Sequence, residues 1–577
     1  MNDGPGDVSD GIADLSDGAA DERVAAWIAA DPDPATRAEL SALGGPDLAE
    51  RFAAPLRFGT AGLRGPVRAG PNGMNVAVVT RATAGLAAWL IEHGHRGGSV
   101  VVGRDARHGS EQFAAAAAQV LAAAGFRVVV VPAPGPTPLV AFACRDLDAV
   151  AGVQITASHN PPGDNGYKVY LAGGAQIVPP ADGEIEELIA ASHDAVDVPR
   201  HDVMHDPRAD EIVGRYLDRI STRFPTVADA SLRIALTPMH GVGGALAVEA
   251  LARAGLTDVH VVDEQFDPDP DFPTVAFPNP EEEGASDLLL ARAEKVGADI
   301  AIALDPDADR CAVGTRVEGT WRMLTGDETG ALLGSFILSD AAAGPDGSPP
   351  VVASTLVSSS LLEKIARRAG ARHVTTLTGF KWLVRAGEPL RYAYEEAIGH
   401  CVDPDAVRDK DGISAAVALA VLADRCRRDG VGVADLLLSL YETHGVHVTR
   451  QHSVRVDDTT VIASLMDRLR ASPPSALAGI PVTAEDYARR SDDLRTDAIA
   501  LSGVAGDGMS VRVMARPSGT EPKLKYYIEM TTPPGFVVSA TQSPAQTTYG
   551  ADTRALVHLL DDMTLRVAAE LAEYGRT

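Results

Sequence analysis

Three segments of the chain share one layout: a β-branched strand, a loop of small or polar residues, an Ala-rich helix ending in Ala-Gly, and a second strand. The segments are Ser99 to Val131, Arg233 to Val262 and Val351 to Leu377, and the glycines that end their helices are Gly125, Gly255 and Gly370. Strands that alternate with helices of this length predict β-α-β units. We therefore expect an α/β protein with three similar α/β/α layered domains.

Both ends of the 577-residue chain depart from this layout. Residues 1–45 form an acidic N-terminal extension with helical spacing over Asp21 to Ala30, which we expect to pack on the surface or to be disordered. Past Arg450 the pattern changes to short strands with flanking helices, which predicts a smaller α+β domain. The segment Pro533 to Thr548 is polar and predicted to be flexible, and an amphipathic helix is predicted from about Asp552 to Tyr574.

The composition excludes several classes of protein. A formal charge of -28 argues against a nucleic-acid partner, since binding to phosphate backbones depends on Lys and Arg. No apolar run approaches the roughly 20 residues that cross a bilayer, and the first thirty residues have no hydrophobic leader, so we expect a cytoplasmic protein with no membrane partner. The four cysteines lack CxxC spacing, which predicts reduced, packed thiols.

A polar loop braced by Gly and Pro runs from Thr156 to Lys168 and places one hydroxyl directly after an apolar stretch. A serine hydroxyl is a weak nucleophile, so Ser158 would need neighbours that activate it. His159 and Lys168 supply donors and a base within about ten residues. The simpler alternative is a turn rich in Asn, Gly and Pro that merely ends a strand.

Three alternate carboxylates, Asp305, Asp307 and Asp309, follow the apolar segment Ala298 to Leu304. Alternate positions at a strand end direct three oxygen ligands toward one point, and such a cluster suits Mg²⁺. The alternatives are a solvated Asp turn or a weak calcium loop. An EF-hand would need a glutamate at its twelfth position, where this chain has Arg316.

Three further motifs are weak signals when each is taken alone. Phe58 to Gly65 is a Gly-rich loop whose backbone can approach an anion closely. Tyr394 to His400 carries two glutamates that could accept sugar hydroxyl hydrogens, although paired glutamates are more often a solvated face. Arg516 to Lys523 combines a guanidinium, hydroxyls and backbone N–H groups on a Pro/Gly turn, which could form an anion nest.

Together, the five motifs resemble those of the α-D-phosphohexomutases, the family that includes phosphoglucomutase and phosphomannomutase, and they occur in the family's order between Phe58 and Met530. The resemblance implies mixed sheets in three domains around a central cleft, followed by the α+β domain. It implies a catalytic phosphoserine domain over residues 46–212, a metal-binding domain over 213–325, a sugar-binding domain over 326–448 and a phosphate-binding domain over 449–577.

The resemblance also implies a role for each matching residue. The implied catalytic residues are Ser158, His159, Arg64 and the general acid/base Lys168, and the implied Mg²⁺ ligands are Ser158, Asp305, Asp307 and Asp309. The implied substrate-binding residues are Arg310, Gly379, Lys381, Glu396, His400 and Lys410, and the implied phosphate-binding residues are Arg516, Ser518, Gly519 and Thr520. The glycines that usually separate the family's aspartates are Pro306 and Ala308 here.

The implied activity is a reversible, Mg²⁺-dependent exchange between sugar 1-phosphate and 6-phosphate, with glucose as the leading sugar and glucose 1,6-bisphosphate as intermediate and activator. Ile398 stands where common glucose and mannose mutases carry serine. The surrounding residues resemble the branch with phosphopentomutases, broad-range phosphoglucomutases and glucose-1,6-bisphosphate synthase, which commonly carries Tyr at His400. Phosphomannomutase, phosphopentomutase and bisphosphate synthase activities therefore remain alternatives. A non-catalytic sensor is disfavoured, because nucleophile, metal ligands and base are all present. We expect a monomer or homodimer.

Overall fold

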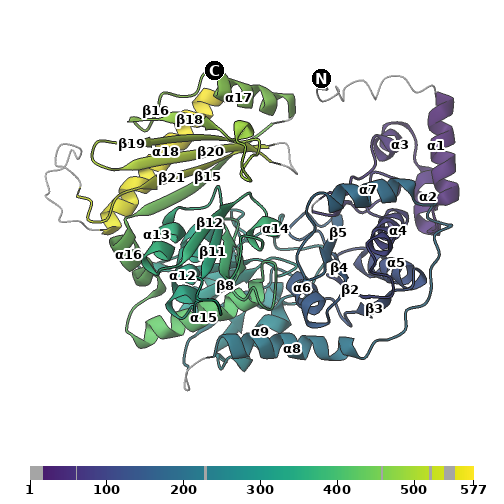
Figure 1. Ribbon diagram of the computed structural model, residues 1–577, viewed down its shortest axis with the longest axis horizontal. Coiled ribbons are helices and arrows are strands. Elements are labelled where there is room, and N and C mark those ends of the chain that lie inside the picture. The colour runs from purple at the N-terminus through teal and green to yellow at the C-terminus, as the bar shows by residue number, and fades with distance from the viewer. Residues whose placement is uncertain are drawn as a thin grey trace.

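The computed structural model describes residues 17–59, 61–225, 230–456, 459–518, 523–537 and 553–576. Figure 1 shows four bodies in chain order, with the first at one side of the molecule, two in the middle and the last at the opposite side. None of the helices within the described ranges is long and apolar enough to cross a membrane. The prediction of α/β domains followed by an α+β domain is confirmed.

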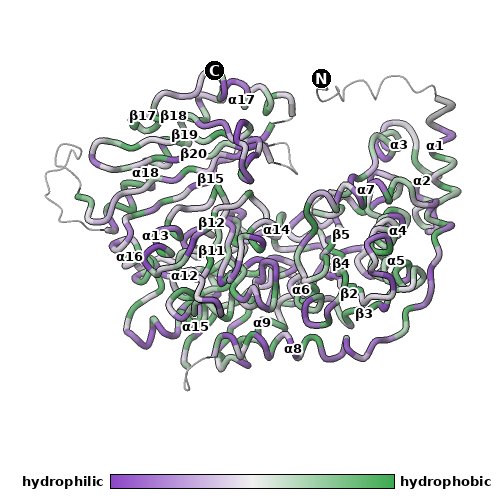
Figure 2. Tube along the Cα trace, in the orientation of Figure 1, coloured by the Kyte–Doolittle hydropathy of each residue, from purple (hydrophilic) through white to green (hydrophobic). Residues whose placement is uncertain are grey.

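The first domain is a five-stranded sheet covered by helices on both faces. Its elements are β1 (Leu63–Pro66), α4 (Val76–Glu92), β2 (Ser99–Arg104), α5 (Ser110–Ala123), β3 (Arg127–Val130), α6 (Thr137–Asp146), β4 (Ala151–Ile155), β5 (Asp164–Leu171) and α7 (Ala181–Ala191). Strands β2 and β4 are buried almost throughout. Figure 2 shows them as hydrophobic tubes at the centre of this domain, as expected for parallel strands covered on both faces.

The second domain follows the helix α8 (Arg208–Arg223), which runs along one edge of the molecule (Figure 1). Its other elements are β6 (Ile234–Thr237), α9 (Gly244–Arg253), β7 (Val259–Val261), α10 (Asp263–Phe266), α11 (Asp287–Val296), β8 (Ile300–Leu304), β9 (Cys311–Val317) and β10 (Thr320–Met323).

The third domain contains the central packing helix α15. Its elements are α12 (Gly326–Ser339), β11 (Val351–Thr355), α13 (Leu361–Arg368), β12 (Arg372–Thr376), α14 (Phe380–Leu383), β13 (Leu390–Glu395), β14 (Gly399–Cys401), α15 (Gly412–Arg428) and α16 (Val433–His444). The small side chains of α15 are buried along most of its length, and it packs on α9, β8 and β9 of the second domain. Small residues allow such close approach, so α15 joins the two middle domains into one core.

The three domains share one strand order. The sheets run β3-β2-β4-β5, β7-β6-β8-β9 and β12-β11-β13-β14, with the first three strands parallel and the fourth antiparallel. The first two sheets add β1 and β10 at the edge. This shared order confirms that the three segments recognised by their layout are related structural units.

The fourth domain is an antiparallel sheet with helices on one side. Its elements are β15 (His447–Arg455), α17 (Thr459–Ala471), β16 (Ala476–Leu477), β17 (Ile480–Pro481), β18 (Thr483–Asp486), a 3₁₀ turn (Tyr487–Arg489), β19 (Ile499–Val504), β20 (Ser510–Pro517), β21 (Lys523–Thr531) and α18 (Thr553–Arg576). The main sheet runs β15-β21-β20-β19-β18. Most of the segment predicted to be flexible, residues 538–548, lies outside the described residues.

The N-terminal extension contributes the helices α1 (Asp17–Ala30), α2 (Pro34–Ala42) and α3 (Gly45–Phe52), which lie on the outer side of the first domain (Figure 1). A backbone bond of 2.9 Å from Val196 N to Ala30 O ties α1 to that domain. Of the two alternatives for this extension, surface packing applies from residue 17 onward. The four cysteines are free and buried, as predicted.

Candidate active site

Corresponding loops of the three α/β domains carry the main predicted site residues. Each loop connects the third parallel strand to the antiparallel fourth, and the loops follow β4, β8 and β13. Each contains one non-glycine residue with positive φ: Ser158 at 56°, Ala308 at 51° and Ile398 at 52°. Such backbone costs about 1–3 kcal/mol and persists where surrounding structure enforces it, often at functional sites.

The three loops meet. Ser158 Oγ of the first loop donates to Asp305 Oδ2 of the second over 3.1 Å. Cys311 N donates to Ile398 O over 3.1 Å, and Arg310 pairs with Gly399 as an isolated β-bridge. The second loop thus contacts both of the others and lies between the serine and the glutamate pair.

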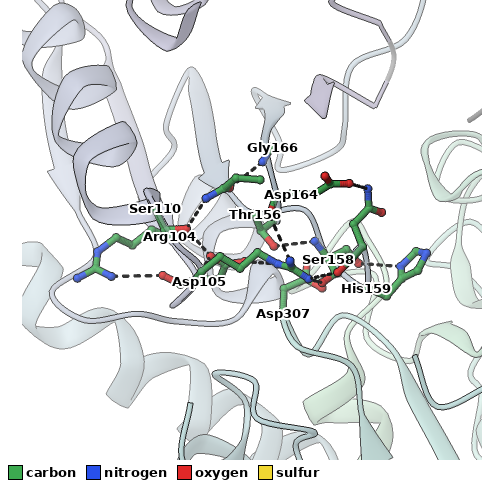
Figure 3. Close-up of polar contacts among 12 residues, drawn as sticks. Arg104, Asp105, Ser110, Thr156, Ser158, His159, Asp164, Gly166 and Asp307 are labelled. Atoms are coloured by element: carbon green, nitrogen blue, oxygen red, sulfur yellow. Dashed lines mark hydrogen bonds and ion pairs between the residues drawn. The ribbon is translucent and has the colours of Figure 1, made fainter. Parts of the chain in front are cut away.

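Ser158 is buried and held from its own loop. Its backbone N–H donates to Thr156 Oγ1 over 2.9 Å, and its Oγ lies 3.3 Å from His159 Nδ1. Figure 3 shows Thr156 and Asp105 on one side of Ser158 and His159 on the other. Burial and the nearby Arg310 and Arg64 lower the pKa of His159 well below its usual value, so its imidazole is neutral at pH 7.

Arg107, in the loop after β2, holds the backbone of the serine loop. Its guanidinium donates to four backbone carbonyls of that loop: Ser158 O at 2.6 Å, Asn160 O at 2.7 Å, Pro161 O at 2.8 Å and Asp164 O at 3.2 Å. Asp105 pairs with it at 3.4 Å, and Phe272 of the second domain lies against it, with 4.8 Å between guanidinium carbon and ring centroid. The rigid fork of an arginine suits this task.

The three predicted metal ligands are buried and adjacent. Asp305, Asp307 and Asp309 each offer a carboxylate oxygen within 4.8 Å of the others. Lys168 Nζ donates to Asp307 at 2.7 Å and to Asp309 at 2.8 Å, and Lys410 Nζ donates to Asp309 at 2.7 Å. The lysines therefore join the acidic cluster.

Two carboxylate oxygens of the cluster have no hydrogen-bond partner among the described residues and could bind a cation. Within the described residues, Asp307 Oδ1 and Asp309 Oδ1 are buried and make no hydrogen bond. Buried carboxylate oxygens without partners are costly, and a hard divalent cation satisfies them. The set of carboxylates and a serine hydroxyl fits Mg²⁺, which prefers oxygen ligands.

Arginines line the same centre. Arg64 and Arg310 are charged neighbours of the aspartates, and the Nε atom of each is buried with no hydrogen-bond partner among the described residues. Burial opposes the charge on Arg310, yet Asp305 and Asp309 hold its pKa above the usual value. Unused N–H donors facing an acidic cluster suit an incoming phosphoryl group.

Gly62 explains why the motif around Arg64 needs glycine. Its φ is +74°, and a Cβ atom there would lie 1.8 Å from Tyr167 O. The close approach lets β1 pair with β5, with Arg64 opposite Gly166. The glycine thus places Arg64 beside the serine loop.

Glu396, which the sequence predicts to bind the sugar, is held by two hydroxyl groups of the third domain. Its Oε2 accepts hydrogen bonds from Thr355 Oγ1 at 2.9 Å and Ser358 Oγ at 3.1 Å. A cavity of about 410 Å³ between the second, third and fourth domains has Glu281, Glu396 and Ile398 among its walls. Burial raises the pKa of the neighbouring Glu395 to about 7, although Lys410 and Arg310 oppose the shift.

Lys410 is fixed by the residues on either side of it. Asp409 Oδ2 accepts from Tyr170 OH of the first domain, and Asp411 Oδ1 accepts from Tyr216 OH of α8, both at 2.8 Å. Asp411 also caps the N-terminus of α15. The segment from Asp409 to Gly412 therefore joins three parts of the molecule, with Lys410 directed at Asp309.

The side chain of His400 lies in the interior of the third domain, although its backbone O accepts from Asp411 N, next to Lys410, over 2.8 Å. It is fully buried on β14, with ring centroids 6.4 Å from Tyr392 and 6.3 Å from Tyr394, and its Nδ1 lies 3.0 Å from Tyr392 OH. Burial lowers its pKa to about 3. In this arrangement the His400 ring packs in the domain interior, and its role in substrate binding stays a prediction.

The predicted phosphate loop reaches the third domain. Arg516 at the end of β20 donates to Thr378 Oγ1 over 2.6 Å, beside Gly379 and the half-buried Lys381. Ser518 N donates to Lys523 O over 2.8 Å, which closes the base of the loop. Gly519 and Thr520 lie outside the described residues.

Comparisons with known proteins match the three α/β/α domains. Models of phosphoglucomutase/phosphomannomutase α/β/α domains I, II and III match residues 55–195, 214–318 and 325–444, in that order. A Haemophilus influenzae protein named "Probable phosphomannomutase" is 41% identical over 469 residues, which covers 79% of this chain and 93% of that protein. The chain belongs to the α-D-phosphohexomutase superfamily. It is an isomerase of the phosphomutase type.

Other members of the superfamily are also similar over most of their length. A human protein named phosphopentomutase is 34% identical over 571 residues, covering 89% of this chain and 92% of that protein. The crystal structure of a phosphoglucomutase/phosphomannomutase family protein from Burkholderia thailandensis has a TM-score of 0.63 at 19% identity, covering 88% of this chain and 96% of that chain. The chain therefore shares the fold of that protein.

Two residues that hold the site together were not predicted from the sequence. Thr137 at the start of α6 donates from Oγ1 to Asp307 Oδ2 over 2.5 Å, and its N–H donates to Asp307 O over 2.9 Å. Arg107 is the other. Arg107 lies in a loop after a strand and Thr137 at the first position of a helix, and only their location at the same sheet edge as Ser158 could have marked them.

Proposed function

We propose that the chain is a Mg²⁺-dependent phosphosugar mutase that interconverts sugar 1-phosphate and 6-phosphate, with glucose as the leading sugar, through phosphorylated Ser158. The observation that carries this proposal is the 3.1 Å contact between Ser158 Oγ and Asp305, beside two more aspartates with unpaired oxygens. A nucleophile and a cation site in direct contact are what phosphoryl transfer needs.

The metal would be held by Asp305, Asp307, Asp309 and Ser158 Oγ. When bound, Mg²⁺ supplies positive charge that offsets the charge of the transferring group. Arg64 and Arg310 supply further N–H donors from the protein. Burial around this centre excludes water, which protects phosphoserine from hydrolysis.

The proposed cycle has two half-reactions. In the first, the sugar 6-hydroxyl loses its proton to a protein base and takes the phosphoryl group, the bond between phosphorus and Ser158 Oγ breaks, and Ser158 Oγ takes up a proton. The bound 1,6-bisphosphate then reorients in the site. In the second, Ser158 Oγ loses its proton and takes the 1-phosphoryl group, the bond between phosphorus and the sugar 1-oxygen breaks, and a proton passes to that oxygen. Lys168 is our proposed acid/base, and the neutral His159 lies close enough to Ser158 Oγ to share this task.

Glu396 is our proposed acceptor for sugar hydroxyls, and Arg516 our proposed clamp for the phosphate that is not transferred. Ile398 has an aliphatic side chain at the position where common glucose and mannose mutases carry serine. A serine hydroxyl there could bond a sugar hydroxyl and so restrict which sugars bind. Its absence favours a broader substrate range, and mannose or pentose phosphates are the second candidates. Glucose-1,6-bisphosphate synthase activity would use the same residues with a different phosphoryl donor.

A substrate panel tests the proposal. Glucose, mannose, ribose and N-acetylglucosamine phosphates are assayed with Mg²⁺ and catalytic glucose 1,6-bisphosphate, using wild type and Ser158→Ala. We expect wild type to convert at least one sugar and Ser158→Ala to convert none. Equal inactivity of both proteins on all four sugars would sink the mutase proposal, and the ranking of the sugars decides between the candidates.

A further inference from the structure

The fourth domain contacts the third through one face of the two-stranded ribbon formed by β20 and β21. Alternate residues of a strand share a face, and residues opposite each other on paired strands are neighbours. The cross-strand pairs along this face are Arg512 with Glu529, Met514 with Tyr527, and Arg516 with Lys525. All three pairs lie on the side of the ribbon that meets the third domain.

At one end of the ribbon, Arg512 makes hydrogen bonds to the third domain. Its guanidinium donates to Leu356 O over 2.9 Å and to Ser358 O, both in the loop after β11. It also bonds Glu529 Oε2, at 3.0 Å from Nε and 2.9 Å from the terminal nitrogen. One side chain thus ties the fourth domain to a loop of the third.

The other carboxylate oxygen of Glu529 accepts hydrogen bonds from the same loop. Its Oε1 accepts from Ser359 Oγ at 2.8 Å and from Ser360 N at 2.7 Å, and it lies 3.1 Å from His447 Nδ1. The carboxylate is almost fully buried. Burial opposes its ionisation, yet Arg512 and His447 hold the pKa of Glu529 well below the usual range.

Residues 355–360, the segment that Arg512 and Glu529 contact, also hold Glu396, the proposed sugar acceptor. Thr355 Oγ1 and Ser358 Oγ donate to Glu396 Oε2. Ser358 therefore gives its carbonyl to Arg512 and its hydroxyl to Glu396. Movement of Arg512 would move the groups that orient Glu396.

The other end of the ribbon carries the proposed phosphate clamp. Arg516 lies four residues after Arg512 on β20 and donates to Thr378. Between the two arginines, Met514 and Tyr527 pack against Leu356 and Val357. The ribbon is thus a continuous, packed element from the phosphate end to the loop that holds Glu396.

We propose that Arg512 and Glu529 are positioning residues that couple the seating of Arg516 on phosphate to the orientation of Glu396 toward the sugar. The roles of Arg516 and Glu396 rest on the proposed function. The pair contacts backbone and hydroxyl groups of the loop, not the reacting atoms. Through it, binding of phosphate at one end of the ribbon orders the sugar acceptor at the other end.

Hydrogen exchange tests the coupling without activity. The variants are Arg512→Lys, which keeps the charge but loses the planar fork, and Arg489→Ala, a matched control on an exposed arginine of the same domain. We expect saturating inorganic phosphate to slow amide exchange in residues 355–360 by about 10-fold in wild type and in Arg489→Ala, but not in Arg512→Lys. Equal protection in all three proteins, or none in wild type, would overturn the proposal.

Steady-state kinetics supply a second test, with the sugar phosphate that wild type converts best. We expect Arg512→Lys and Ser358→Ala each to raise KM about 10-fold, with kcat changed less than about 3-fold, and the double variant to be no worse than the worse single variant. Effects that multiply would contradict a shared pathway through Ser358. If wild type converts no sugar, the mutase proposal fails, and the exchange experiment still decides the coupling.

Discussion

Ser158, the proposed nucleophile, has a backbone conformation that is set by its surroundings. Its φ of 56° is unusual for a residue other than glycine, and Arg107 holds its carbonyl in place. The loop therefore presents Oγ to Asp305 before any substrate arrives. Such preorganisation lowers the reorganisation needed during phosphoryl transfer.

Asp307 allows a direct test of the metal site. Mg²⁺ that binds only the folded protein stabilises it, by about 2.7 kcal/mol at 100 times its Kd. We expect Mg²⁺ to raise the Tm of wild type and to leave the Tm of Asp307→Asn unchanged, since the variant lacks a charged ligand. The measurement is thermal unfolding with and without Mg²⁺. Asp340→Asn, at an exposed surface pair, is the control, and a Mg²⁺ shift retained by Asp307→Asn would contradict the assignment.

His400 predicts a pH dependence of stability. Its imidazole is neutral in the folded protein because burial lowers its pKa to about 3, whereas an unfolded histidine titrates near pH 6.5. Between these values the unfolded chain binds a proton that the folded chain does not, so the free energy of unfolding falls as pH falls from about 6.5 toward 3.

The variant His400→Gln lacks this titration. We expect its unfolding free energy to depend less steeply on pH than that of wild type, by about 1.4 kcal/mol per pH unit between roughly pH 6 and 4. Urea unfolding at several pH values measures the difference. Parallel curves for the two proteins would show that His400 is accessible to protons in the folded state.

The three α/β domains each contribute the same loop to the site, namely the one between the third parallel strand and the antiparallel fourth strand. The motifs that carry Ser158, the aspartates and Glu396 could be recognised from sequence because each keeps its chemistry within a few residues. Arg107 and Thr137 could not, since their partners lie 51 and 170 residues away. Sequence patterns report local spacing, whereas these contacts depend on which strand ends share a sheet edge.

Arg107 gives the element-scale prediction. Arg107→Lys keeps a charge beside Asp105 but cannot reach four carbonyls, so we expect the serine loop to lose its fixed geometry. The expected result is a kcat lowered by about 10-fold to 100-fold with KM changed less than about 3-fold. Arg104→Lys, nearby at the end of β2, is the control. A kcat equal to that of wild type would show that the loop holds its shape without this clamp.

At the scale of the whole molecule, the site exists only where domains meet. The first domain supplies Ser158, the second the aspartates and the third Glu396, and the fourth brings Arg516 to the loop containing Thr378. The sequence predicted the four domains and their order. It could not predict that His400 packs in a domain interior, because burial of a polar side chain is set by neighbouring sheets and not by its own motif.

Arg516 gives the prediction at this scale. A hydrogen bond to a charged group contributes about 1.5–3 kcal/mol, so we expect Arg516→Ala to raise KM for the sugar phosphate about 10-fold to 100-fold, with a smaller change in kcat. The comparison of KM with kcat is the measurement, and Arg489→Ala is the control. An unchanged KM would remove Arg516 from the proposed phosphate clamp.

Intact-mass spectrometry determines whether Ser158 carries the phosphoryl group. Wild type and Ser158→Ala are incubated with Mg²⁺ and glucose 1,6-bisphosphate, and peptide mapping locates any added group. We predict one added phosphoryl group of about 80 Da in wild type, located at Ser158, and none in Ser158→Ala. No mass increase in wild type, or the same increase in both proteins, would show that Ser158 is not the phosphoryl carrier.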